Sequence, residues 1–478
     1  MNKLFWIIGA MVANTIAAAT ILPHQQSIDG AWNGSLTVGP QTLGITVRFT
    51  TGDTGLRATI DIPQQGATGL QLKNVSYDDT RVYMELPAGP TLAVFDGRHV
   101  GDSIGGTFTQ AGLSGTFFLK RSSQAAAMAE ELAEPAETLP YVEEEVTFHN
   151  AAITLAGTLT LPGSGAPLPH PAAVMITGSG PQNRDEELFG FRPFHTIADH
   201  LTRNGIAVLR YDDRGVGGST GSVSEATTED FARDVLAAVD FLKNRSDIDP
   251  ERIGLIGHSE GGIVAPLASS MSDDVGFMVL MAGTSVSGAE ILLEQGALIM
   301  RVSGAAEADI ERQIAFQKRT FEAIRSGDGW DELAADLETK LRESVAEMPD
   351  SQRNIITDVD TFINTQVQAQ LTALQTPWFR YFLDYDPAVA LRTIDTPILA
   401  LFGELDLQVP PAQNRGPLEQ ALRDGNHPDY TVRVFPQANH LFITATTGSP
   451  AEYATLEKVF VPEFLPLITE WILERVSR

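Results

Sequence analysis

One five-residue segment restricts the fold of this chain more than any other. Residues 257–261 read Gly-His-Ser-Glu-Gly and match the pattern Gly-x-Ser-x-Gly. An apolar run at 253–256 precedes the segment, and small and aliphatic residues at 261–271 follow it, so the sequence predicts a buried strand, a sharp turn and a helix. The serine backbone at such a turn is strained and its neighbours must be small, which Gly257 and Gly261 satisfy.

The predicted turn makes Ser259 a candidate nucleophile. Its Oγ is expected to stand exposed at the turn, and the backbone N–H of Glu260, at the start of the helix, is expected to point toward an oxyanion formed there. A glycine-rich turn with a solvated serine is the alternative interpretation. The strand before the motif and the helix after it favour the nucleophile.

A serine is a weak nucleophile at neutral pH and needs a base that an acid orients. Residues 403–406 end one predicted strand with two carboxylates, and His440 follows the next strand. The alternation of a strand does not choose between Glu404 and Asp406, which share a face. Position in the loop beyond the strand favours Asp406. The order Ser259, Asp406, His440 is the one that Gly-x-Ser-x-Gly hydrolases use.

Two loops supply the remaining candidates near the serine. The segment 178–181 follows a predicted strand, at the place where hydrolases of this topology provide a second oxyanion N–H, and Ser179 is preferred there over Gly180. His258 adjoins the serine, and we expect its side chain to point away from the site.

The glycine-rich segment 210–219 is an alternative site, of the phosphate-loop type. It lacks the Gly-Lys-Ser/Thr ending of such loops, and its glycines follow two aspartates that repel phosphate. A structural turn with Arg214 paired to a carboxylate is the better interpretation. His195 and His200 lie on a predicted helix and are expected to be structural.

The chain from residue 141 to 478 alternates predicted strands and helices, which indicates a mostly parallel sheet with right-handed crossovers. Between two of these strands, residues from about 285 to 393 read as helices and form a predicted cap over the strand ends. Its aromatic residues, which either contact an acyl chain or fill the core of the cap, are Trp378, Phe379 and Phe382.

The region 28–121 has a different pattern, with apolar and polar residues alternating between short turns. It predicts a small antiparallel β-domain of seven or eight strands, either a barrel or a sandwich. We assign no catalysis to it. Residues 122–140 are rich in alanine, glutamate and proline and are predicted to be a linker.

The first 19 residues have the features of a signal peptide. Lys3 supplies a positive charge, residues 4–16 are mostly apolar, and three alanines at 17–19 form a small-residue cleavage site. We therefore expect an exported protein, periplasmic or secreted, without a stable membrane anchor after cleavage. An uncleaved anchor is the alternative.

Composition excludes several classes of function. The net charge is −28, which argues against binding nucleic acid or anionic lipid. The chain has no cysteine, so it cannot form a disulfide, use a thiolate as a nucleophile or bind a metal through cysteine. No other spacing predicts a metal site or a cofactor, and the sequence predicts no oligomeric state.

Five segments resemble exported bacterial α/β-hydrolase esterases, close to dienelactone-hydrolase-like and serine-aminopeptidase-like sequences; they are residues 178–185, 210–215, 257–262, 378–382 and 403–409. The resemblance implies an α/β-hydrolase fold with a helical cap inserted before the acid-bearing strand. It also implies hydrolysis of short-chain carboxylic esters through an acyl-enzyme on Ser259. The family pattern Gly-x-x-Asp-x-x-Val matches Gly403, Asp406 and Val409. The β-domain is similar to one that precedes some of these esterases.

Three hypotheses for function remain. An esterase acting on a small-molecule ester is favoured. A serine peptidase of the aminopeptidase-like type needs a site for a substrate amine, for which Glu290 and Glu294 of the cap are candidates. A non-catalytic binding protein on a hydrolase scaffold is expected to lack a member of the triad, whereas this chain has all three candidates.

Overall fold

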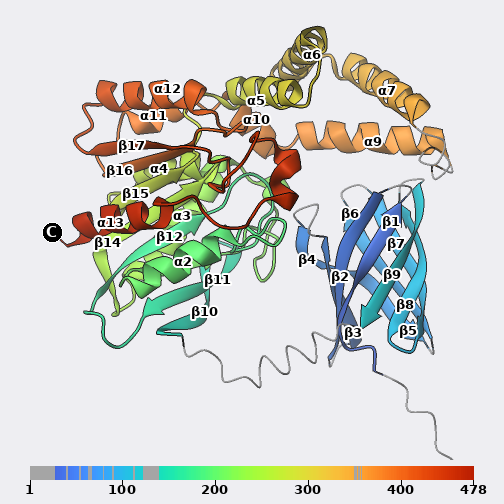
Figure 1. Ribbon diagram of the computed structural model, residues 1–478, viewed down its shortest axis with the longest axis horizontal. Coiled ribbons are helices and arrows are strands. Elements are labelled where there is room, and N and C mark those ends of the chain that lie inside the picture. Colours follow the sequence, from blue (N-terminus) through green and yellow to red (C-terminus); the bar gives the residue numbers. More distant parts are fainter. Residues whose placement is uncertain are drawn as a thin grey trace, which may run out of the picture.

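The computed structural model describes most of the chain (Figure 1). The described residues are 27–38, 41–52, 55–62, 67–78, 80–88, 91–110, 113–121, 139–348, 353, 356 and 358–477. The expected signal peptide at 1–19 lies outside these ranges, and so does the expected linker apart from Leu139 and Pro140.

The N-terminal domain is one antiparallel sheet in the order β4-β3-β2-β1-β9-β8-β7-β6-β5. Its strands are β1 (Gly30–Val38), β2 (Gln41–Gly52), β3 (Gly55–Ile62), β4 (Ala67–Gln71), β5 (Lys73–Asp78), β6 (Arg81–Ala88), β7 (Thr91–Val100), β8 (Ser103–Gln110) and β9 (Leu113–Arg121). The sheet curls into a barrel (Figure 1). Leu72, which lies between β4 and β5, donates its N–H to the carbonyl of Ala58 in β3 at 2.9 Å.

The barrel has nine strands, more than the seven or eight expected. The difference comes from the run 67–78, which divides at Leu72 into two strands that pair at opposite edges of the sheet. Alternation places one face of each strand inside, as Ile45, Val47 and Phe49 of β2 illustrate. These side chains fill the interior of the barrel with a hydrophobic core.

The C-terminal domain has an eight-stranded sheet in the order β10-β11-β13-β12-β14-β15-β16-β17. Its strands are β10 (Tyr141–Asn150), β11 (Ile153–Pro162), β12 (His170–Ile176), β13 (Ala207–Tyr211), β14 (Ile248–His258), β15 (Phe277–Met281), β16 (Ile398–Gly403) and β17 (Tyr430–Phe435). The hairpin β10–β11 joins β13 antiparallel, and the strands from β13 to β17 are parallel. This is the predicted mostly parallel sheet.

Helices cover both faces of this sheet (Figure 1). One layer contains α3 (Thr228–Lys243), α4 (Gly261–Met271) and α12 (Pro411–Asp424), and the other contains α2 (Pro193–Arg203) and α13 (Phe464–Val476). Two short 3-10 helices, η2 (Val223–Glu225) and η3 (Pro450–Thr455), lie in the connections. Because both faces are covered, strands β13, β15 and β16 are buried along their whole length.

The connection from β15 to β16 carries the helical cap. Its described helices are α5 (Gly288–Val302), α6 (Glu307–Ser326), α7 (Trp330–Glu347), α9 (Val359–Leu374), α10 (Pro377–Asp384) and α11 (Pro387–Leu391). Leu333 and Leu337 of α7 pack against Ile363 and Val367 of α9, one helical turn apart on each helix. In Figure 1 the helices α6, α7 and α9 extend away from the sheet.

The two domains have separate hydrophobic cores, since the buried residues of the barrel and those of the parallel sheet form different clusters. We therefore predict that a fragment spanning 141–478 folds without the barrel, because each core closes on its own chain. Circular dichroism and cooperative thermal unfolding of the purified fragment test this. An insoluble fragment, or one without a cooperative transition, would contradict it.

Candidate active site

Ser259 occupies the predicted sharp turn between β14 and α4. Its φ is 56°, in the left-handed region that non-glycine residues rarely adopt, and its N–H donates to the Met281 carbonyl at 2.8 Å. A Cβ at Gly257 would lie 2.0 Å from the Gly261 carbonyl oxygen, and a Cβ at Gly261 would lie 2.2 Å from that of Ile176. Only glycine therefore fits at the two flanking positions.

Asp406 and His440 meet in the loops that follow β16 and β17. The Asp406 Oδ2 lies 2.8 Å from His440 Nδ1, and its Oδ1 accepts the N–H groups of Gln408 and Val409 at 2.8 Å each. Asp406 is 1% exposed. These contacts fix the orientation of the carboxylate. They also assign the Nδ1 proton of His440 to the bond with Asp406, which leaves Nε2 free to accept a proton.

Glu404, the alternative acid, has a different partner. Its Oε2 accepts the N–H of Gln437 at 3.0 Å, the kind of backbone contact expected for the carboxylate that is not the acid. The sequence does not choose between the two acids by alternation. The structure brings only Asp406 to the imidazole, because Gly403 ends β16 and the chain then turns.

The segment after β12 lies against the elbow. A Cβ at Gly178 would lie 3.1 Å from the Ser259 Cβ, which shows how closely the two loops approach. Among the hydrogen bonds of the described residues, none takes the backbone N–H of Ser179 or of Glu260 as its donor. Both groups are therefore available to a ligand beside Ser259, and Glu260 is also the N-cap residue of α4.

The side chain of Glu260 ties the elbow to the cap. It is buried, and its carboxylate accepts the Trp378 indole N–H at 2.8 and 3.0 Å and the Thr228 hydroxyl at 2.8 Å. Burial raises the pKa of Glu260, and these bonds together with one from the Ser179 hydroxyl oppose the rise. Helix α10 is therefore attached to the residue that follows the nucleophile.

The three aromatic residues proposed for substrate binding pack with one another. Trp378 stacks on Phe382 with ring centroids 5.3 Å apart, and Phe379 meets the Trp378 ring edge-on at 5.7 Å. Phe382 is buried against Gly288, and Phe379 packs with the cap cluster. These contacts favour the interpretation of the three as cap core. A contact with an acyl chain stays a prediction.

His258 lies in a different place from the one expected. Its ring was predicted to point away from the site, but its Nδ1 lies 2.9 Å from Glu186 Oε1 and its Nε2 lies 2.9 Å from the His440 carbonyl oxygen. The rings of His258 and His440 are 4.6 Å apart, centroid to centroid. Sequence reasoning missed Glu186 because its partner is 72 residues away in the chain.

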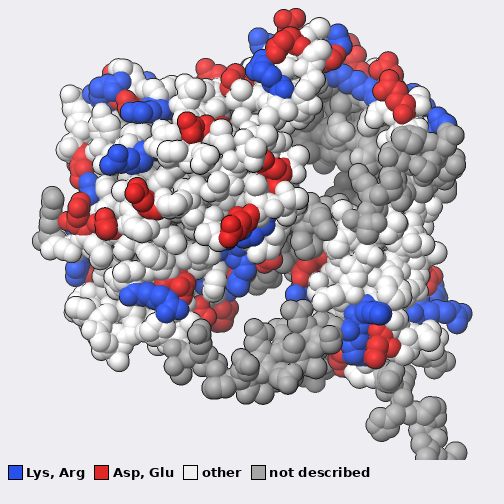
Figure 2. Space-filling view, viewed as in Figure 1, with Lys and Arg blue, Asp and Glu red and all other residues white. Residues whose placement is uncertain are grey.

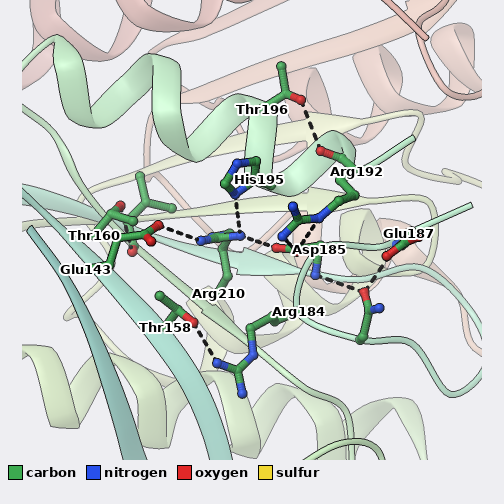
Figure 3. Close-up of polar contacts among 12 residues, drawn as sticks. Glu143, Thr158, Thr160, Arg184, Asp185, Glu187, Arg192, His195, Thr196 and Arg210 are labelled. Atoms are coloured by element: carbon green, nitrogen blue, oxygen red, sulfur yellow. Dashed lines mark hydrogen bonds and ion pairs between the residues drawn. The ribbon is translucent and has the colours of Figure 1, made fainter. Parts of the chain in front are cut away.

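A network of buried ion pairs holds the loop that contains Ser179 and Glu186 (Figure 3). Asp185 accepts from Arg210 and Arg192, and Arg184 bonds Asp212 at 2.8 Å. Arg210 is 3% exposed; burial lowers its pKa, and Asp185 with Glu143 counteracts the effect. The loop is therefore anchored to β13 and the turn after it by ion pairs whose carboxylates are buried, since Asp185 and Asp212 are 7% and 4% exposed.

The neighbouring glycine-rich turn is structural, as predicted. Arg214 donates to both carboxylate oxygens of Asp234, at 2.6 and 2.9 Å. In the parts of the chain that the structure describes, no group of three or more His, Asp or Glu side chains is placed to hold a metal ion. None of the described helices combines the length and apolar character needed to cross a membrane.

Comparison with known proteins gives a family assignment. A model described as the alpha/beta hydrolase family matches residues 174–456. Esterase EstD of Thermotoga maritima is 27% identical over 346 residues, which are 71% of this chain and 69% of EstD. The putative hydrolase YtaP of Bacillus subtilis is 31% identical over 91 residues, 17% of this chain and 30% of YtaP. The solved esterase Pf2001 of Pyrococcus furiosus has a TM-score of 0.42 and 17% identity, covering 71% of this chain and 93% of that one.

The first prediction from this geometry separates the two acids. Asp406→Asn should lower kcat by about 10⁴, because an amide at this position favours the wrong tautomer of His440. Glu404→Gln should lose far less, since its oxygen still accepts the Gln437 N–H. Steady-state kinetics of both purified variants tests the assignment, and the reverse order of the two losses would contradict it.

A second prediction concerns the buried ion pairs. Asp185→Asn should destabilise the fold by about 3 kcal/mol, because it leaves the buried Arg210 charge with only the more distant carboxylate of Glu143, at 3.6 Å. Asp309→Asn is the matched control, since its partner Arg312 is exposed at the surface. Denaturant unfolding of both variants gives the comparison. Equal stabilities would show that the pair at Asp185 contributes no more than a surface pair.

Proposed function

We propose that this chain, which belongs to the alpha/beta hydrolase family, is a carboxylic ester hydrolase that forms an acyl-enzyme on Ser259. The observation that carries the proposal is the arrangement of three loops at one end of the sheet. A strained serine, a buried carboxylate bonded to an imidazole, and two unoccupied backbone N–H groups come together there. The similarity to an esterase, EstD, supports the choice of ester as substrate.

In the proposed reaction His440 Nε2 removes the proton of the Ser259 hydroxyl as Oγ attacks the ester carbonyl carbon. The carbonyl oxygen becomes an oxyanion, which the N–H groups of Glu260 and Ser179 stabilise. His440 then gives its proton to the alcohol oxygen, and the alcohol leaves. Water repeats the sequence: His440 takes its proton, the hydroxyl adds to the acyl carbon, and the proton returns to Ser259 as the acid is released.

Asp406 stays a carboxylate throughout this sequence. It accepts the Nδ1 proton of His440, so it holds the ring in the productive tautomer and stabilises the imidazolium that forms after each proton transfer. Its second oxygen is occupied by the N–H groups of Gln408 and Val409, which keep the carboxylate in place as the charge on the ring changes.

We propose short-chain acyl esters as the substrates and an exported location for the enzyme. The family that residues 178–185, 257–262 and 403–409 resemble implies this substrate class, while the segments themselves indicate the fold and the triad. The apolar segment and the three alanines before residue 20 support export, either to the periplasm or out of the cell.

The alternative of a serine peptidase has less support. An aminopeptidase needs a free carboxylate for the substrate amine, and Glu290 instead accepts the N–H and hydroxyl of Ser287 at 3.1 and 2.7 Å to cap α5. Glu260 directly follows Ser259 in the chain, and its oxygens already accept from Trp378 and Thr228. Glu294 is exposed on the surface of the cap.

The test is the loss of activity on removal of the nucleophile. Ser259→Ala should lower kcat by about 10⁶ on a p-nitrophenyl ester, since acylation has no other hydroxyl held in this geometry. Ser270→Ala, which removes an exposed serine from the end of α4, is the control and should keep wild-type activity. A near-normal rate for the Ser259 variant would refute the mechanism.

The same assay distinguishes the substrate classes. We expect turnover of p-nitrophenyl esters of increasing chain length to be fastest with short acyl groups, and little turnover of aminoacyl-anilides. Faster cleavage of the anilides would replace the esterase assignment with the peptidase.

A further inference from the structure

The pair formed by Glu186 and His258 is not used in the mechanism above, yet it contacts all three loops of the site. His258 ends β14 and directly precedes the nucleophile. Its Nε2 lies 2.9 Å from the His440 carbonyl oxygen, in the loop of the base. The Glu186 Oε1 that faces His258 Nδ1 also accepts the N–H of Gly178, at 2.9 Å, in the loop of the second oxyanion donor. Both side chains are about 95% buried.

The hydrogen-bond partners of the His258 ring show which of its two nitrogens carry a hydrogen. A backbone carbonyl only accepts, so Nε2 carries a hydrogen. Glu186 Oε1 accepts from Gly178, and the other oxygen of Glu186 is buried without a partner, so the carboxylate acts as an acceptor toward Nδ1 as well. A ring that donates through both nitrogens is an imidazolium. Consistently, although burial opposes the charge, the carboxylate of Glu186 raises the pKa of His258.

We propose that Glu186 and His258 form a buried ion pair that positions the catalytic base and keeps it ready to accept a proton. The inference rests on the proposed role of His440. The charged and titratable groups around the His258 ring are Glu186, His440 and Asp406. Asp213, which is half-buried and bonded to the Thr177 hydroxyl, lies within electrostatic range of Glu186.

The polarity of the pair gives it a definite effect on catalysis. Its positive end is the His258 ring, whose centroid is 4.6 Å from that of His440, and its negative end is the more remote carboxylate. Because like charges repel, a positive ring beside the base opposes a second positive charge there and favours transfer of the proton from the base to the leaving alcohol. The hydrogen bond from His258 to the His440 carbonyl fixes the position of the His440 backbone relative to the turn at Ser259.

The substitution Glu186→Gln in the full chain tests whether the charge on His258 acts on His440. The substitution keeps the size of the side chain and an oxygen for the Gly178 N–H, but it removes the charge that stabilises the imidazolium. His258 then becomes neutral, and the acidic limb of the pH profile of kcat/KM should move up by about one pH unit, the order expected for a partly compensated charge at this separation.

The matched control is Glu187→Gln, the adjacent half-buried carboxylate in the same loop. Removal of the Glu187 charge leaves the contact between Glu186 and His258 intact, so this variant should leave the acidic limb unchanged or move it down. The two variants lose the same charge, but only Glu186→Gln is predicted to move the acidic limb up. An unchanged limb in Glu186→Gln, or a downward shift like that of the control, would overturn the proposal, because a purely structural role alters kcat without this shift.

A second measurement needs neither catalysis nor a stable variant of Glu186. In wild-type protein labelled with ¹⁵N-histidine, one ring should carry hydrogens on both nitrogens at pH 7.5, and its signals should be missing in His258→Asn. A neutral ring at His258 would overturn the proposal. The charge of this ring is observable even if no ester is hydrolysed, so failure of the esterase assignment and failure of the ion pair are distinguishable.

Discussion

The strained backbone at Ser259 is the constraint on which the site depends. A left-handed residue between a buried strand and a helix is stable only where the chain around it is held on every side, and here the support is close backbone contact. Gly257 meets Gly261, and Gly261 meets the end of β12, at distances that exclude any side chain. The elbow is consequently pressed against the loop that contains Ser179. The proposed nucleophile and the proposed oxyanion donors are thus parts of one rigid unit, in which the position of one sets the position of the other.

Buried carboxylates connect this unit to the rest of the domain, each with a different function. Asp406 binds the imidazole of His440, the proposed base, Glu186 binds that of His258, and Glu260 attaches the cap to the elbow through Trp378. Asp185 fastens the intervening loop to β13 through Arg210 (Figure 3). A charge without access to water is costly unless it is paired, so each of these groups specifies a single arrangement of its loop. The surface view in Figure 2 shows acidic and basic side chains scattered over the exposed face, consistent with charge there serving solubility.

Much of this organisation could be predicted from the sequence because the relevant signals are local. The elbow follows from two glycines and the strand and helix beside them, and Asp406 and His440 follow from polar residues placed after strand ends. The α/β-hydrolase fold and the preceding β-domain are confirmed. Contacts between side chains that are far apart in the sequence could not be predicted. Glu186 and His258 are 72 residues apart and Trp378 and Glu260 are 118 apart, and no spacing rule relates residues that meet only through the tertiary fold. The nine-stranded count could not be predicted for a similar reason, since only the pairing partners reveal that the run 67–78 is divided at Leu72.

The proposed mechanism requires a covalent intermediate on Ser259. Its most direct test is mass spectrometry of the full chain, mixed with excess p-nitrophenyl acetate and quenched in acid during turnover, followed by peptide mapping. The account predicts one acetyl group per chain, located on the peptide that contains Ser259, together with a burst of p-nitrophenol equal in amount to the enzyme. Turnover without any acylated peptide, or with the acetyl group on a different residue, would contradict it.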